Sequence, residues 1–574
     1  MATNTKKILQ AWLFFIFGAF CILGFFVSAP FYNGYKIPYG EGVSTISSSE
    51  LVYYLWYAVY GLGAVAGFCG GLYLTRFSEW IESFFRSVIS RPQVMLGFLA
   101  GFVFVGVISF RFLVLLNAPI ADDESTYRFI AQTLLTGNLV NPIPEDAVFY
   151  KMQFVVMNKM GWFGKYPIGH PLLLAAGEWL QVPWLPGAVF TSLSLIITFF
   201  IGQKLFGNVA SSIGVCLLAL SPHFVATGAT LLSQTSSTLF MLLGFWAFLC
   251  LREKKRLIWA LWAGVFFGLG VLIRPMPGLF FVAAAAAVFV LDRQGLSFGN
   301  HFKENFRFLG LAAVPVFLVG VVWLYINYKQ SGSIFVTGIQ EAGGLGISND
   351  RLAPIFLSLT GAFVRENFWL FGWPCSFLFV WFIRSKKSLA LFWAIIAAEL
   401  AYRVIAPKTV VATTGPIYVT EIVPLLALAT GSGMIEVKRA FDKMGSALVK
   451  KAVISVVAAS MIVAMLCFWP VQIKNISQNQ QVWNIPSKIL AYNGIKRALV
   501  FAPHFVPPES YASWAYYPPI PSPSLKDEII FVKPMFDEKG SVEPMLIFWK
   551  KHYSDRPAYV LGFDKGKAVF YQLN

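Results

Sequence analysis

Charged residues are scarce in this chain of 574 residues. Asp, Glu, Lys and Arg together make up 13% of it, whereas a soluble domain carries about 25%. Hydrophobic residues reach 57%, and the mean hydropathy is +0.65. This composition excludes a soluble globular protein and predicts a polytopic α-helical membrane protein.

Residues that form disulfides or bind metals are also few. The six cysteines all lie in apolar stretches, so we expect no disulfide outside the membrane. The five histidines show no metal-ligand spacing, and no Walker or dinucleotide-binding glycine motif occurs. No cofactor is therefore indicated with certainty, and a requirement for a divalent metal stays open.

Long apolar runs dominate the chain instead. A helix needs roughly 17–25 such residues to cross the hydrocarbon core of a bilayer. About thirteen runs are counted as spans, an odd number that puts the two termini on opposite sides. The predicted spans are 8–28, 51–75, 94–116, 184–203, 207–221, 231–251, 257–273, 275–291, 308–327, 367–383, 388–405, 418–435 and 452–470.

The loops between these runs differ in charge. Lys and Arg gather in alternate loops, and the positive-inside rule makes that side cytoplasmic. The net charge of +17 is thus largely a topology signal, and scattering of the basic residues over short loops disfavours nucleic-acid binding. The clusters lie at 6–7, 76–91, 204, 252–256, 293–307, 384–387 and 438–451.

This topology divides the chain into three parts. Residues 1–93 are expected to form an extra pair of spans plus an interfacial helix, with a cytoplasmic N-terminus. Residues 94–470 form the main transmembrane domain, which has a long outer loop at 118–183. Residues 471–574 form a small extracytoplasmic α/β domain. Its predicted strands are 498–502, 528–534, 558–563 and the C-terminal KAVFYQL, and its predicted helix is 543–552.

The first outer loop opens on an acidic triplet, Asp122-Asp123-Glu124, directly after a predicted span. Ionisable groups at a membrane boundary are costly unless they are paired, solvated or used. A solvated loop start is the simplest interpretation of the triplet. The following STYRFIAQTLLTG has apolar residues at helical spacing and predicts an amphipathic helix on the membrane surface.

The same loop ends in KYPIGHPLLLAAGEWL, which carries Lys165, Tyr166 and His170. Its apolar part is too short to span. An acidic pair followed by YxxxAxxLLxG and KYPxGHPLL resembles the polyprenyl-phosphate-dependent glycosyltransferases of the GT-C class. The bacterial branch that is similar to protein O-mannosyltransferases and aminoarabinose transferase is the most alike. The segments LSPHFVATGATLLSQTSSTLF, GLGVLIRP, NYKQSGSIFVTG and GPIYVTEIVPLLALA resemble further parts of that family, in order through roughly residues 94–440.

The resemblance implies roles for the acids. In that family, an acid of the pair activates the acceptor hydroxyl as general base. Asp123 matches it, because Tyr127 then falls at the family's aromatic position. Glu124 would assist, and Asp122 would be a solvated neighbour. Asp122, Tyr127, Tyr166 and His170 together would form the acceptor or substrate loop.

The resemblance also implies a cationic site for the phosphate of the donor lipid. Arg274 is the first candidate, and Lys165, Arg365, Arg403 and Tyr418 are the others. Simpler explanations remain for two of them: Arg403 at a membrane boundary, and Arg365 paired with its neighbour Glu366.

Two positions depart from the family pattern. Many relatives have Arg before the Tyr of the GPxY segment, where this chain has Ile417. Relatives often have an acid after the SP turn, where this chain has Ser233-Gln234. The second departure leaves a further carboxylate or metal ligand from that helix without support.

The predicted function is an inverting membrane glycosyltransferase. It would move a sugar from a polyprenyl-phosphate donor to an acceptor hydroxyl of a glycan, lipid or protein. The reaction would occur on the periplasmic or extracellular side of a bacterial inner membrane, with membrane lipids as the other contact. A glycolipid transporter or flippase without chemistry is one alternative, and a ligase or polymerase that uses a diphosphate-linked glycan is another.

Overall fold

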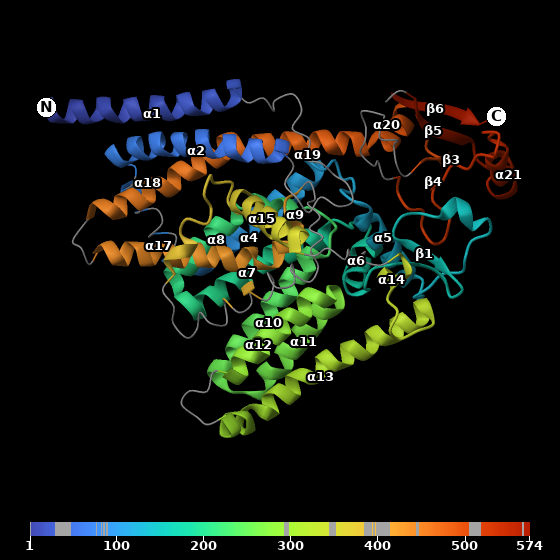
Figure 1. Cartoon of the computed structure of the whole chain (residues 1–574), viewed down its shortest axis with the longest axis horizontal. Coiled ribbons are helices and arrows are strands. Elements are labelled where there is room, and N and C mark those ends of the chain that lie inside the picture. Colours follow the sequence, from blue (N-terminus) through green and yellow to red (C-terminus); the bar gives the residue numbers. More distant parts are fainter. Residues whose placement is uncertain are drawn as a thin grey trace.

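The computed structural model describes most of the chain, which is largely helical (Figure 1). The described residues are 2–28, 48–75, 77, 79–81, 83, 87, 90–291, 298–343, 352–383, 393, 396–397, 414–442, 447–503, 518–564 and 567–573.

Eight helical segments within these ranges are long and apolar enough to cross a membrane, or nine if the bent pair α8–α9 is one span. This confirms a polytopic helical membrane protein, whereas the count of thirteen spans is not confirmed. The segments are α1 (Ala2–Ser28), α2 (Ser48–Leu74), α4 (Pro92–Leu113), α7 (Leu185–Phe206), α10 (Gln234–Lys254), α13 (Phe298–Ser331), η3 (Ile417–Ile422) with α17 (Val423–Asp442), and α18 (Ala447–Val463) continuing through η4 (Ala464–Phe468) into α19 (Trp469–Trp483).

Three predicted spans are short or bent. Residues 257–273 and 275–291 are the 17-residue apolar helices α11 (Leu257–Ile273) and α12 (Pro275–Leu291), which meet at Arg274. The run at 207–221 is α8 (Asn208–Ala219), followed by a 58° bend into α9 (Pro222–Gly228). Ser221 caps α9 by accepting the Phe224 N–H at 3.2 Å, so the predicted SP turn is a helix start.

The predicted span at 367–383 is wrong. Helix α15 (Leu352–Trp369) ends there, and turns lead to the short 3₁₀-helix η2 (Val380–Phe382). The Asn367 amide donates to the Pro374 carbonyl at 3.2 Å and accepts the Phe377 N–H at 3.3 Å, which stabilises the turn. A hydropathy average cannot detect such a hydrogen bond. The predicted span 388–405, with Arg403, and most of the predicted interfacial helix fall outside the described residues.

The first two helices pack on the rest of the bundle. Helix α1 lies along α2, and α2 lies along α18 (Figure 1). The approach of α1 and α2 is close, because a Cβ on Gly67 would meet the Gly18 backbone nitrogen at 2.5 Å. Arg365 of α15 is ion-paired with Glu50 of α2 through two bonds, at 2.6 and 2.7 Å, and both side chains are 1% exposed. The extra spans are therefore anchored by a buried charge pair.

The first outer loop folds into helices and a hairpin. Helix α5 (Asp122–Leu135) confirms the predicted amphipathic helix, and α6 (Gly169–Trp179) is the predicted short apolar segment. Between them lie η1 (Ala147–Tyr150) and the antiparallel strands β1 (Val155–Asn158) and β2 (Gly161–Gly164). Arg128 on α5 bonds Glu178 on α6 at 2.5 and 3.2 Å, which ties the two helices together.

The C-terminal segment forms a four-stranded sheet in the order β4-β3-β5-β6. β3 is parallel to β4 and β5, and β5 and β6 are antiparallel. These elements confirm the predicted strands and helix: β3 (Ala498–Phe501), β4 (Ile529–Val532), β5 (Ala558–Asp564), β6 (Lys567–Leu573) and α21 (Glu543–His552).

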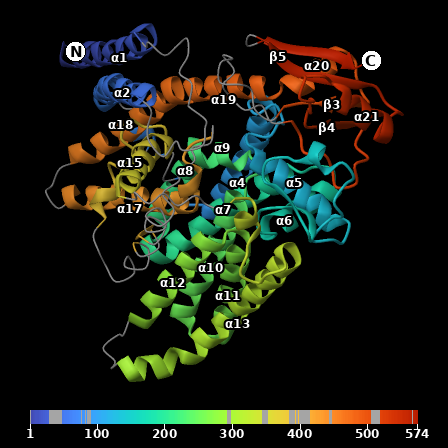
Figure 2. The ribbon, with the colours of Figure 1, turned by 45° about the vertical axis from the view of Figure 1, so that its right-hand side comes forward.

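This sheet and α21 lie beside the first outer loop, as both views show (Figures 1 and 2). The rings of Phe149 and Phe548 stack at 4.1 Å, and the Lys533 N–H donates to the Phe149 carbonyl at 2.7 Å. Tyr150 and Tyr553 share a hydrogen bond at 2.7 Å within one apolar cluster. The C-terminal segment therefore stabilises the outer loop directly.

Candidate active site

The three acids of the triplet occupy the first turn of α5, where the helix dipole favours negative charge. Ala121 is extended and precedes the helix without a side-chain cap. The rotation of about 100° between successive residues of a helix points the three side chains in different directions. Their surroundings consequently differ.

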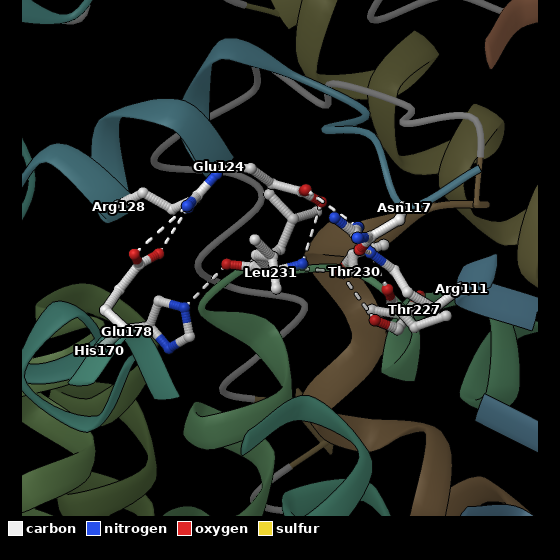
Figure 3. A network of polar contacts seen from close by, with 11 residues as sticks. Arg111, Asn117, Glu124, Arg128, His170, Glu178, Thr227, Thr230 and Leu231 are labelled. Atoms are coloured by element: carbon white, nitrogen blue, oxygen red, sulfur yellow. Dashed lines mark hydrogen bonds and ion pairs between the residues drawn. The ribbon is translucent and has the colours of Figure 1, made fainter. Parts of the chain in front are cut away.

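Glu124 points into the protein and is fully buried. It is ion-paired with Arg111 of α4 at 3.4 Å and accepts the Leu231 N–H at 3.0 Å (Figure 3). Burial raises the pKa of Glu124, and Arg111 and the Leu231 N–H oppose that rise. A carboxylate enclosed in this way supports the position of α5 and is not exposed to an acceptor.

Asp122 is also buried, with 3% of its surface exposed, so the expectation of a solvated neighbour is wrong. Its Oδ2 has no hydrogen-bond partner among the described residues. Burial raises the pKa of Asp122 well above its usual range; Asp123 adds to the rise and Lys165 opposes it. The start of α5 is covered by protein rather than by solvent, which sequence alone does not reveal.

Asp123 differs from its neighbours because it is only half-buried. The Tyr166 hydroxyl donates a close hydrogen bond to Asp123 Oδ1. Burial, followed by the charge of Asp123, raises the pKa of Tyr166 well above its usual range, so Tyr166 stays protonated as a donor. Tyr166 therefore orients the carboxylate that the resemblance predicts to be a general base.

A polar frame built on the Leu231 peptide lies beside α5 (Figure 3). The Leu231 peptide donates its N–H to Glu124, and its carbonyl accepts from His170 Nε2 at 2.8 Å. His170 Nδ1 lies 2.9 Å from the Ser236 hydroxyl, and Tyr127 and Ser233 share a hydrogen bond at 3.1 Å. The segment 230–236 thus connects α5, α6 and α10. His170 is 3% exposed, which makes it a framework residue.

Arg274 lies where α11 ends and α12 begins, and it is 9% exposed. It forms a close ion pair with Glu421 of η3, and its guanidinium lies 5.5 Å from the centroid of the Tyr418 ring. Pro275 follows it at the first position of α12 and interrupts the apolar run. A cation held at such a helix break is positioned for an anionic group.

The electrostatic effects of these groups on one another indicate that they lie in one region. Burial raises the pKa of Tyr127; Asp123 and Tyr418 add to the rise, and Arg274 opposes it. Tyr418 also raises the pKa of Tyr166. The structure therefore assembles Asp123, Tyr127, Tyr166, Arg274 and Tyr418 from α5, the loop before α6, the α11–α12 junction and η3.

Lys165 lies beside the same group. Its Nζ is 3.2 Å from the centroid of the Phe154 ring and 4.9 Å from that of Tyr166, a cation–π arrangement. It is half-buried and acts electrostatically on Asp122. Lys165, Arg274 and Tyr418 are thus the described members of the predicted phosphate set that lie near Tyr127 or Tyr166.

Arg365 does not join this set. It is paired with Glu50, and the alternative that it pairs with Glu366 is also wrong, because Glu366 bonds His223. Arg403 lies outside the described residues.

Sequence reasoning missed Arg111 and Glu421, the ion-pair partners of Glu124 and Arg274. A signal for both was present, since each is an ionisable residue inside an apolar run. No group of three or more His, Cys, Asp or Glu that could hold a metal ion occurs in the part of the chain that the structure describes.

Comparison with known proteins shows what the chain is similar to. Residues 172–326 match the family model of dolichyl-phosphate-mannose-protein mannosyltransferase. Among solved structures, ArnT from Cupriavidus metallidurans in the apo state superposes with a TM-score of 0.53 at 14% identity, over 82% of this chain and 93% of that one. The family model and the shared fold both support a GT-C glycosyltransferase.

A second structure of the same ArnT gives the same result. ArnT from Cupriavidus metallidurans bound to undecaprenyl phosphate superposes with a TM-score of 0.53 at 14% identity, over 81% of this chain and 93% of that one. At this identity the likeness demonstrates the shared fold, and it confirms the predicted GT-C-like architecture. No curated protein matches the chain significantly. The domain boundaries 1–93, 94–470 and 471–574 stay predictions.

Proposed function

We propose that this membrane glycosyltransferase moves a sugar from a polyprenyl-phosphate donor to an acceptor hydroxyl, with inversion at the anomeric carbon. The observation that carries the proposal is the difference between the three acids. Asp123 alone of the triplet is only half-buried, and Tyr166 orients it close to Tyr127, on which Arg274 also acts. A base and a cation for a leaving phosphate are thus close together.

The proposed reaction is a single displacement. The acceptor oxygen attacks the anomeric carbon while its proton passes to the Asp123 carboxylate. The bond between that carbon and the phosphate oxygen breaks, and both of its electrons stay with the polyprenyl phosphate. A positioned base accelerates such a transfer when it lies within hydrogen-bond reach of the hydroxyl.

Arg274 and Lys165 are proposed to stabilise the charge that develops on the leaving phosphate. Glu421 and Tyr418 both contact the Arg274 guanidinium, so little reorganisation is needed when the anion forms. Undecaprenyl phosphate bound to ArnT, which has the same fold, supports a lipid-phosphate donor. A periplasmic or extracellular site in a bacterial inner membrane is part of the proposal.

The test is transfer by purified protein with Asp123→Asn. The amide cannot take the acceptor proton but keeps the shape of the side chain, so transfer should fall about 10²–10⁴-fold. Binding of undecaprenyl phosphate should stay within about twofold of wild type. Glu145→Gln is the control, because this side chain lies in the same outer loop and is 76% exposed. Normal turnover by Asp123→Asn would contradict the proposal.

Two further measurements define the substrates. Assays with monophosphate and diphosphate carriers separate the proposed donor from a diphosphate-linked glycan, and transfer only from the diphosphate would overturn the proposed donor. Mass spectrometry of glycolipids and envelope glycans from a deletion strain should then reveal one missing sugar, which names donor and acceptor together.

A further inference from the structure

A second buried polar network adjoins the proposed phosphate site. It consists of His223 on α9, Glu366 on α15 and Thr420 on η3, whose side chains come from elements far apart in the sequence. These residues are 0%, 2% and 3% exposed. His223 Nδ1 lies 2.7 Å from Glu366 Oε2, and its Nε2 lies 3.0 Å from Thr420 Oγ1. The reaction proposed above does not use these groups.

The number of hydrogens available determines the direction of each hydrogen bond in this network. The Thr420 hydroxyl donates its one hydrogen to the Ile417 carbonyl at 2.8 Å. Its oxygen must therefore accept from His223 Nε2–H. His223 Nδ1 and Glu366 then share one further proton, on the ring or on the carboxyl group, so the pair has no net charge in either form. Glu366 fixes the ring, and the ring holds Thr420.

The element that contains Thr420, η3, is short and also contains the two residues that contact Arg274. η3 is a six-residue 3₁₀-helix, a conformation with poor hydrogen-bond geometry. It follows Gly415, whose φ is +110°, a value that side chains rarely adopt. Tyr418 and Glu421, which flank Thr420 in the sequence, contact the Arg274 guanidinium. Movement of Thr420 would therefore move both contacts.

We propose that His223 and Glu366 are positioning residues for the phosphate site, acting through Thr420 on η3 and thereby on Arg274. The inference rests on the proposed function of Arg274. A positioning role differs from a general packing role in its effect on binding. Loss of the hydrogen bond between His223 and Thr420 should weaken binding of the donor and leave binding of the acceptor unchanged. The neighbouring Arg365 holds α15 to α2, so α15 gives the pair a fixed support.

The experiment compares Thr420→Val with Thr420→Ser. Valine has the same shape as threonine and removes the hydroxyl, whereas serine keeps it. Thr420→Val should raise the donor KM and the Kd for undecaprenyl phosphate about three- to tenfold, the worth of one buried hydrogen bond. The acceptor KM should stay within about twofold, and Thr420→Ser should restore wild-type affinity.

Thr430→Val is the matched control. Thr430 is fully buried in α17, and its hydroxyl also bonds a backbone carbonyl, that of Leu426 at 3.0 Å. It should bind the donor like wild type. Equal weakening by Thr430→Val, or wild-type donor affinity in Thr420→Val, would overturn the inference.

A second pair of variants tests the ring itself. His223→Gln places an amide N–H near the position of Nε2 and can still reach Thr420, whereas His223→Asn is too short and reaches towards Glu366 alone. Donor affinity should therefore be higher in the Gln variant, and equal affinities would overturn the inference. The wild-type arm tests the proposed function separately. If wild type neither binds undecaprenyl phosphate nor uses a monophosphate donor, the proposed function itself fails.

Discussion

At the scale of single residues, the Glu124–Arg111 pair is the most consequential for stability. Both side chains are almost completely buried, at 0% and 4% exposed. A buried charge that loses its partner is strongly destabilising, because nothing replaces the lost solvation. The pair thus makes α5, and with it Asp123, dependent on one contact with α4.

Glu124→Gln should therefore lower the free energy of unfolding by about 3–5 kcal/mol. Thermal unfolding in detergent measures the change. Arg439→Met is the comparison, because in its pair with Glu436 the two side chains are 63% and 26% exposed. Loss of such a pair should cost at most about 1 kcal/mol. The double variant Glu124→Gln/Arg111→Met should be more stable than Glu124→Gln alone. A Glu124→Gln protein as stable as wild type would refute a structural role.

His170 should make stability depend on pH. Burial lowers the pKa of His170 from 6.5 to about 4. Between these values the unfolded chain binds a proton that the native protein does not, so stability falls as pH falls. The free energy of unfolding is therefore not affected by this histidine above about pH 6.5. It falls by up to about 3 kcal/mol as pH approaches 4.

Unfolding temperatures at pH 7.5 and pH 4.5 provide the measurement. His170→Gln keeps an amide donor near the Leu231 carbonyl and does not titrate in this range. Its stability should change less between the two pH values than that of wild type. An identical pH dependence in both proteins would show that other groups are responsible.

At the scale of elements, the approach of α6 to α11 determines how the outer loop meets the Arg274 junction. Gly169 starts α6 in the KYPIGHP motif, and a Cβ on it would meet the backbone of Leu272 and Ile273 at 2.6 Å. These atoms belong to the last turn of α11, directly before Arg274. Backbone cannot yield as a flexible side chain does, so only glycine fits.

Gly169→Ala should therefore separate α6 from α11 and reduce transfer at least about tenfold, since a displacement of about 1 Å can cost about 10²-fold. Transfer rate and unfolding temperature together measure this effect. Gly101→Ala on α4 is the control, because a Cβ there meets nothing within 4 Å. If both variants behave like wild type, the close approach does not matter for function.

The same scale explains which elements sequence could predict. Apolar periodicity located α5, and β-branched and aromatic runs located β3–β6, because each pattern acts within a few residues. The span at 367–383 was wrong because the Asn367 side chain stabilises a turn within an apolar run. Hydropathy averages over a window and cannot detect one such bond.

At the scale of the whole molecule, the described helices and the basic loops predict one orientation. Lys and Arg alternate with acid-bearing outer loops along the chain, and translocation of basic loops is disfavoured. The C-terminal sheet packs on the first outer loop, so the two must lie on the same side of the membrane.

A topology reporter fused after Asn574 should therefore report an extracytoplasmic position, and one fused after Lys255 should report a cytoplasmic position. Alkaline phosphatase activity distinguishes the two compartments. A cytoplasmic signal from the fusion after Asn574 would mean that the predicted number of spans and the outside placement of Asp123 are both wrong.

Sequence by itself determined the class of molecule, most of its helices and the C-terminal strands. These depend on composition, local periodicity and short motifs, which are properties of neighbouring residues. Tertiary structure alone decided that Asp122 and Glu124 are buried, that Glu421 holds Arg274 and that Arg365 holds Glu50. Each of these outcomes depends on a partner more than 10 positions away or on burial by other elements. Neither can be predicted from the spacing of residues along the chain.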